Sequence, residues 1–210
     1  MRIIFTTREI RSIVIATAVL SVAFAIAKIV NVYGFGSLLS INVLSFLPEA
    51  FMFSLVSVGI GFIAHELIGH KLLAQRFDNY AEFVLWPVGL VIALAFSFMG
   101  FVFAAPGAVM IGSRPDLWGE VKPISRKKYG IISLGGPVVN IALALLFIAL
   151  NFFNPFELWA TAAMINVWLA LFNMLPIPPL DGSKVFAWDR RVFVVLFAAI
   201  IALFIFVGGF

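Results

Sequence analysis

Long apolar runs separated by short polar segments dominate the pattern of this chain. A helix needs roughly 20 apolar residues to cross the hydrocarbon core of a bilayer, and four of the runs have about that length. A fifth run is shorter but contains no polar residue. The pattern predicts an all-α membrane protein, a polytopic bundle whose spans are expected at about 13–33, 48–73, 129–150, 157–175 and 192–207.

A further apolar stretch, 85–111, is expected to enter the membrane and return to the same side. It is interrupted by helix-breaking residues, Pro87, Gly89, Gly100, Pro106 and Gly107. If it returns, every Lys and Arg except Lys28 falls on one face, and the opposite loops, 34–47 and 151–156, contain none. Such an excess is typical of the cytosolic face. If the stretch crosses fully, the basic residues divide between both faces without bias.

The first apolar run has two interpretations. Ala25-Ile26-Ala27 resembles the small-residue cleavage site of a signal peptide. However, the apolar run continues beyond this site, through Ile29 to Val32. This continuation favours a retained membrane anchor.

The composition supports an integral membrane protein. The chain is 63% hydrophobic and 11% charged, whereas a soluble domain is about half apolar and about a quarter charged. No linker-like or low-complexity stretch divides it, so we expect residues 1–210 to form a single membrane-embedded domain. The net charge of +4 includes no long basic run and does not indicate nucleic-acid binding. Because cysteine is absent, a metal site must use His and carboxylates.

The segment His65-Glu66-Leu67-Ile68-Gly69-His70 contains both histidines of the chain, close to the end of the second apolar run. Ionisable groups in a span are costly and indicate a functional site. Two His and a Glu on one helix provide zinc with two nitrogen ligands and a carboxylate base. The usual motif is H-E-x-x-H, and side chains five residues apart on a regular α-helix diverge by about 140°. We therefore expect a π-bulge, which Gly69 eases, to realign them.

A catalytic zinc commonly takes three protein ligands, so a carboxylate is needed beside the histidines. Asp181 follows the apolar, proline-rich segment 173–180, where an acid needs a partner; a helix cap is the alternative role. Glu49 and Glu157 suit the first turns of helices. The other acids are expected to be surface charges: Glu9, Asp78, Glu82, Asp116, Glu120 and Asp189.

The proposed ligands also constrain the topology. His65 and His70 lie near the end of one span, and Asp181 follows the end of another. The two groups can meet only if an even number of crossings separates them, which holds when 85–111 is re-entrant. The metal would then lie within the membrane but near its cytosolic surface.

Three segments together resemble the site-2 protease family of intramembrane zinc metalloproteases: His65–Lys71 with Ala74–Phe77, Gly135–Asn140, and Asn173–Gly182 with its P-I-P-x-L-D-G core. The resemblance implies one zinc ion per chain held by His65, His70 and Asp181. It also implies Glu66 as the general base, and Asn173 and Asn140 as donors to the substrate backbone or the oxyanion. Sheet or loop structure that dips into the membrane between the first two segments is a trait of this family.

The function implied by the resemblance is regulated intramembrane proteolysis. The enzyme would hydrolyse a peptide bond in or near a transmembrane helix of a membrane-protein substrate, with zinc-bound water activated by Glu66. We expect it in the cell membrane, with the active site near the cytosolic face. The lipid bilayer and the substrate helix are the expected partners, and the sequence indicates neither the substrate nor the oligomeric state.

Two other functions are compatible with parts of the sequence. A degenerate family member would bind transmembrane helices without cleaving them, because the extra residue in the His-Glu motif would weaken zinc binding. A metal transporter would need a polar path to both faces, and the half of the membrane toward loops 34–47 and 151–156 has almost no ionisable ligands. Gly135-Gly136-Pro137 lacks the Lys and Ser/Thr of a phosphate loop, so close helix packing is expected there.

Overall fold

The computed structural model describes residues 5–40, 42, 45–115 and 118–208. Arg2 and Asp116, which the sequence assigned to the basic face and to the surface, lie outside the described residues. Within the described part the elements follow in this order: α1 Thr7–Tyr33, η1 Phe35–Leu39, α3 Leu47–Ala64, η2 His65–Leu72, α4 Leu73–Arg76, β1 Asn79–Leu85, α5 Pro87–Ser97, β2 Gly107–Ser113, α6 Arg126–Phe153, α7 Glu157–Asn173, α8 Asp181–Trp188 and α9 Arg190–Gly208.

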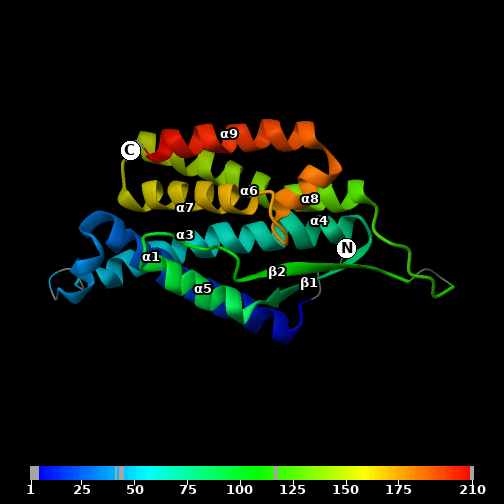
Figure 1. Cartoon of the computed structure of the whole chain (residues 1–210), viewed down its shortest axis with the longest axis horizontal. Coiled ribbons are helices and arrows are strands. Elements are labelled where there is room, and N and C mark those ends of the chain that lie inside the picture. Colours follow the sequence, from blue (N-terminus) through cyan, green and yellow to red (C-terminus); the bar gives the residue numbers. More distant parts are fainter. Residues whose placement is uncertain (1–4, 41, 43–44, 116–117, 209–210) are drawn as a thin grey trace.

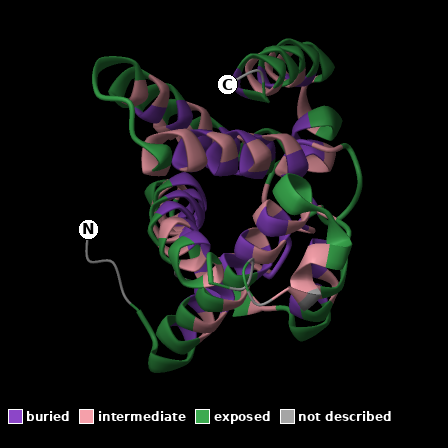
Figure 2. Ribbon diagram, turned by 90° about the vertical axis from the view of Figure 1, so that its left-hand side faces the viewer, coloured by how far each residue is buried: buried purple, intermediate pink, exposed green. Residues whose placement is uncertain are grey.

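Among the described residues, four helices are long and apolar enough to cross a membrane, and the protein is a helical integral membrane protein. They are α1, the continuous helix of α3, η2 and α4 (Leu47–Arg76), α6, and α9. The remaining long helix, α7, has 17 residues, and residues from Ala162 to Phe172 on several of its faces are buried. In contrast, α9 lies on the outside of the bundle, where its surface is largely exposed (Figure 2).

The long helices lie side by side, and the chain reverses direction after each of them (Figure 1). The α3 and α7 helices pack against each other at the centre. On one side α1 packs against α3, and on the other α6 and α9 pack against α7. This arrangement brings the C-terminal end of α3, the start of α6 and the end of α7 to the same end of the molecule (Figure 1).

The apolar stretch 85–111 forms an excursion that returns to its starting point. Strands β1 and β2 pair antiparallel, and Leu85, where the chain leaves β1, is the register partner of Gly107, where β2 begins. Between them α5 runs outward beside α1, and an extended limb, 98–106, runs back (Figure 1). Aromatic contacts fix this limb to α7: Phe101 packs on Trp168, and Phe103 on Phe172.

One prediction about a surface charge is wrong. Glu9 is 1% exposed, and its Oε2 atom lies 2.5 Å from Nζ of Lys71, which is equally buried. Glu9 lies in the first turn of α1, which begins at Thr7 with the Thr6 hydroxyl as its cap. This turn packs against β1 and the end of the α3 to α4 helix, so the pairing comes from contacts far apart in the sequence. By contrast, Asp78 is exposed, as predicted, and Glu82 is partly exposed.

Candidate metal centre

The His-Glu motif adopts a π-helical turn. Residues His65–Leu72 form η2, between the α-helical segments α3 and α4, which confirms the predicted π-bulge. The wider turn brings the two imidazoles to the same side, with ring centroids 4.7 Å apart and Nε2 atoms 3.1 Å apart. The inserted residue is therefore compatible with two ligands for one ion.

Asp181 meets these imidazoles from the other side. Its Oδ2 atom lies 3.4 Å from Nε2 of His65 and 3.0 Å from Nε2 of His70, and all three side chains are buried. A tetrahedral ion with ligand bonds of about 2.0–2.1 Å requires ligand atoms about 3.3 Å apart. Two imidazoles and a carboxylate at these separations match the donors and the spacing of a catalytic zinc site.

The surroundings of Asp181 keep it available as a ligand. It is the first residue of α8 and makes no capping hydrogen bond, because Leu180 occupies the cap position. Its Oδ1 atom accepts a hydrogen bond from Lys184, which leaves Oδ2 for the imidazoles. The Lys184 ammonium lies beside the carboxylate and favours its ionised form, which metal binding requires.

Hydrogen bonds behind the imidazoles set their tautomers. Nδ1 of His65 lies 2.5 Å from Oδ1 of Asn140, and Nδ1 of His70 lies 2.9 Å from the carbonyl oxygen of Ile132. The Ile132 carbonyl is an acceptor only, and the amide of Asn140 directs its own N–H groups to Gly61 and Asn166. Both Nδ1 atoms must then carry the proton, which leaves both Nε2 lone pairs free for a metal.

Two glycines of α6, Gly135 and Gly136, let the backbone of this helix contact the backbone of the His-Glu motif. A Cβ atom at Gly69 would lie 2.4 Å from Cα of Gly136, and one at Gly135 would lie 2.1 Å from the Gly69 carbonyl oxygen. A Cβ atom at Gly136 itself would lie 2.5 Å from Nε2 of His65 and 2.6 Å from Nε2 of His70. The close helix packing predicted for this segment is confirmed, and it forms one wall of the metal centre.

The catalytic base candidate, Glu66, faces the sheet. Its side chain is buried, and Oε2 accepts a hydrogen bond from the backbone N–H of Val109 in β2 at 3.2 Å. The β2 strand, which connects the excursion to α6, is thus in direct contact with the motif. The edge of β2 and the ligand cluster lie on two sides of one carboxylate.

The two asparagines proposed as substrate donors occupy different positions. Asn173 is half-buried at the C-terminal end of α7, and one of its N–H groups donates to the Leu169 carbonyl. Asn140 is fully buried, and its contacts with His65, Gly61 and Asn166 use both polar atoms of its amide. Asn140 therefore supports the ligand His65 from the side of the imidazole that faces away from the metal. Asn166, which supports Asn140, and the carbonyl of Ile132 were not among the site residues predicted from the sequence.

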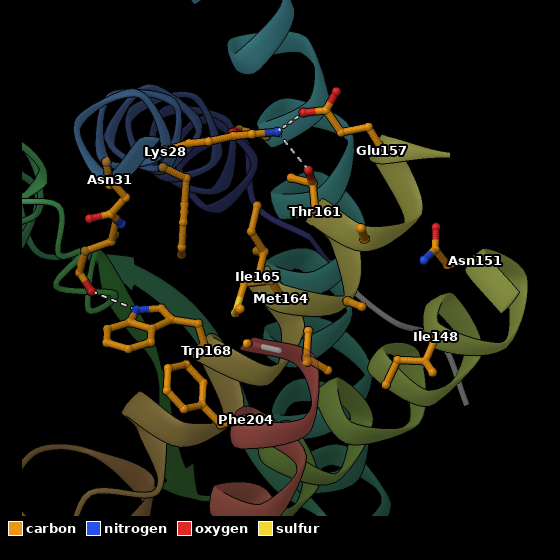
Figure 3. A pocket seen from close by; sticks show the side chains of 18 of the residues that line it. Lys28, Asn31, Ile148, Asn151, Glu157, Thr161, Met164, Ile165, Trp168 and Phe204 are labelled. Atoms are coloured by element: carbon orange, nitrogen blue, oxygen red, sulfur yellow. Dashed lines mark hydrogen bonds and ion pairs between the residues drawn. The ribbon is translucent and has the colours of Figure 1, made fainter. Parts of the chain in front are cut away.

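A separate apolar cavity lies away from the ligands. It has a volume of about 720 Å³ and is enclosed by parts of α1, α6, α7 and α9 (Figure 3). At its polar end Lys28 bonds to Glu157 (2.6 Å) and to Thr161 (3.1 Å). Trp168, which donates to the Val102 carbonyl, lines the cavity beside the extended limb 98–106. None of the three candidate ligands lines this cavity.

Comparison with known proteins agrees with this site. A sequence model of peptidase family M50 matches residues 152–189, which include Asn173 and Asp181. The chain is also 38% identical, over 152 residues, to a protein of Methanocaldococcus jannaschii with the provisional name zinc metalloprotease. The matched region covers 70% of this chain and 75% of the relative. No solved structure matches the chain.

A buried cluster of two histidines and an aspartate in an integral membrane protein, together with these matches, is typical of a membrane metallopeptidase. The chain belongs to peptidase family M50, the site-2 protease family, as its motifs predicted. The family implies zinc as the metal, and the cluster of His65, His70 and Asp181 fits that ion.

Proposed function

We propose that this protein is an intramembrane zinc endopeptidase that cleaves membrane proteins in or near a transmembrane helix. The observation that carries the proposal is the convergence of three ligand atoms from η2 and α8 beside Glu66. The side chains that make the site come from elements far apart in the sequence, and each is oriented by its own hydrogen bonds. One zinc ion per chain, held by His65, His70 and Asp181, fits this arrangement.

The proposed mechanism assigns one task to each residue. Zinc, when bound, would act as a Lewis acid on the scissile carbonyl and lower the pKa of a water molecule. Glu66 would take a proton from the attacking water and then give it to the leaving amine, as a general base and acid. Asn140 and the Ile132 carbonyl would keep the imidazoles in the tautomer that binds metal. Asn173 would donate its remaining N–H to the substrate backbone or the oxyanion.

The β2 strand offers a place for extended substrate. A transmembrane helix uses its backbone groups in internal hydrogen bonds, so the scissile bond becomes accessible only after local unwinding. The unwound backbone groups then need new partners within the membrane. A substrate segment that added to the edge of β2 would obtain them next to Glu66. The contact between Val109 and Glu66 supports this placement.

The cavity beside α1, α7 and α9 would hold the part of the substrate helix that remains folded. Its lining is predominantly apolar, and its aromatic end reaches the re-entrant limb at Trp168 and Val102 (Figure 3). From Trp168 the α7 helix continues to Asn173, so the cavity and the metal centre lie along one helix. This arrangement supports a substrate that enters from the bilayer.

We propose that 85–111 is re-entrant and that the metal centre lies near the cytosolic face of the cell membrane. The strands that lead into and out of this excursion, β1 and β2, connect it to α4 and to the start of α6 at the same end of the molecule (Figure 1). The basic residues of the 114–128 and 184–191 segments lie near the same end, which the positive-inside rule assigns to the cytosol. The 151–156 loop lies at the other end and contains no Lys or Arg.

The proposal is tested by Glu66→Gln in purified protein reconstituted with a transmembrane substrate. We expect cleavage to be lost while zinc per chain, measured by elemental analysis, stays near that of the wild type. Asp181→Ala is the matched variant, and it should lose both zinc and cleavage. Cleavage by Glu66→Gln would contradict the role of the base. Wild-type protein that holds no zinc after reloading would indicate a degenerate member that binds helices without cleaving them.

A further inference from the structure

A buried ion pair adjoins the metal centre and has no task in the proposed hydrolysis. Lys71 directly follows His70, and its Nζ atom pairs with Oε2 of Glu9 in the first turn of α1. Both side chains are 1% exposed. Such a pair often stabilises a fold no better than apolar residues of similar size, because both charges lose their hydration. Its presence here suggests a role other than stability.

The second oxygen of the Glu9 carboxylate holds the sheet. Oε1 accepts a hydrogen bond from the backbone N–H of Phe83 in β1 at 2.9 Å. Phe83 is the register partner of Val109, whose N–H donates to Glu66. Strands β1 and β2 form a two-stranded ribbon. The N–H groups of Phe83 and Val109 point outward from opposite edges of this ribbon, as they do in a non-hydrogen-bonded antiparallel pair. One pair of residues in the ribbon is therefore held between two carboxylates.

These contacts form a closed ring around the base. From Glu9 they pass through Phe83 and Val109 to Glu66, and from Glu66 they return along the π-helical turn to Lys71 and Glu9. The ribbon lies between α1 and the helix that carries the motif (Figure 1). Because the ring is closed, a change at Glu9 alters the position of Val109 relative to Glu66.

We propose that Glu9 is a positioning residue that, through the Phe83–Val109 pair, sets the orientation of the Glu66 carboxylate. This inference rests on the proposed function, in which Glu66 is the general base. Glu9 touches neither the ligands nor the substrate path, so its effect is on the rate of the chemical step. Loss of contacts that orient groups at a metal site typically costs about 10–100-fold.

Two double variants separate positioning from stability. Glu9→Gln with Lys71→Met removes both charges but keeps an oxygen acceptor for the Phe83 N–H. Glu9→Met with Lys71→Met is similar in volume and removes the acceptor as well. We expect the Gln variant to cleave nearly as fast as the wild type, and the Met variant to lower kcat about 10–100-fold at unchanged zinc content and KM. If the Met variant does not fold, Glu9→Leu with Lys71→Met takes its place.

Three results would overturn the inference: wild-type kcat in both variants, equal loss of kcat in both, or loss of zinc in the Met variant. Amide hydrogen exchange in residues 79–85 and 107–113 gives a readout independent of cleavage. Faster exchange in the Met variant alone supports the role of the Glu9 hydrogen bond to Phe83 in holding the ribbon. Equal exchange in both variants contradicts that role. If the wild type cleaves nothing, the proposed protease function fails, and hydrogen exchange still decides whether Glu9 holds the ribbon.

Discussion

At the scale of single residues, the geometry of the metal centre depends on its glycines, which have no side chain, as much as on the ligands. Gly136 lies against both imidazoles, and Gly69 and Gly135 let the two backbones meet there. The ligand atoms are 3.0–3.4 Å apart because the helices can approach this closely. The glycines therefore determine the geometry of the site without touching a metal themselves.

Gly136→Ala should disrupt metal binding. The new methyl group would lie 2.5–2.6 Å from the Nε2 atoms of both histidines, so at least one imidazole must move. We expect zinc affinity to fall by about 10–100-fold, as measured by competition with a chelator. Gly59→Ala is the matched control, because a Cβ atom there meets nothing within 4 Å. It should leave zinc unchanged and stabilise α3 by about 0.5–1 kcal/mol. Equal zinc affinity in both variants would contradict this account.

At the scale of elements, the π-helical turn has two consequences. It aligns His65 with His70, and it absorbs the extra residue, so that the helix that follows keeps the orientation it would have after the usual motif. Lys71, directly after the second ligand, reaches Glu9. The π-helical turn thus carries two ligands of the metal centre and the contact with α1.

Deletion of Ile68, which is 56% exposed, tests this account. The motif would then have the usual spacing on a regular α-helix, with its two histidines about 40° apart. Because the deletion removes the residue that the wide turn absorbs, the residues after it should keep their orientation, and Lys71 should still reach Glu9. We expect zinc per chain and the melting temperature both to stay near those of the wild type, as they should in Ile68→Ala. Loss of zinc or a large fall in melting temperature after the deletion alone would contradict this role of the turn.

The sequence predicted those elements whose cause is local. Apolar runs give the long helices, and the spacing of His65 and His70 gives the π-bulge, because both depend on residues close in the chain. The burial of Glu9 could not be predicted, since it depends on Lys71 and Phe83, which reach it only in the folded chain. The same holds for Asn140, whose contact with His65 requires two helices to pack at their glycines.

At the scale of the whole molecule, the proposed topology gives a labelling pattern. The chain contains no Cys, so a single introduced thiol reports on one position. Asn154→Cys lies in the loop after α6, and Val121→Cys lies before α6 in an exposed segment. In intact cells, an impermeant thiol reagent should label the first and leave the second unlabelled until the membrane is opened. Labelling of both before lysis would contradict the assignment of the metal centre to the cytosolic face.

The cavity should distinguish substrates by size. Ala160 lines it, so Ala160→Phe would fill space that we assign to a substrate helix. We expect KM for a transmembrane substrate to rise about tenfold, equivalent to about 1.4 kcal/mol of binding. KM for a short peptide that reaches only the metal centre should not change. Ala199→Phe, at an exposed position on α9, is the control and should affect neither substrate. If Ala160→Phe changed KM equally for both substrates, the cavity would not be the site that recognises a transmembrane substrate.

The origin of the three ligands also bears on how the protein is made. His65 and His70 are translated and inserted well before Asp181, which emerges only after α7. Until then a nascent chain can offer zinc two imidazoles but lacks the third ligand of a catalytic site. Under the proposed function, the chain would therefore gain hydrolytic power only after α7 and the start of α8 have been made. Other membrane proteins that leave the same translocon would then not be exposed to cleavage before insertion of the new enzyme is complete.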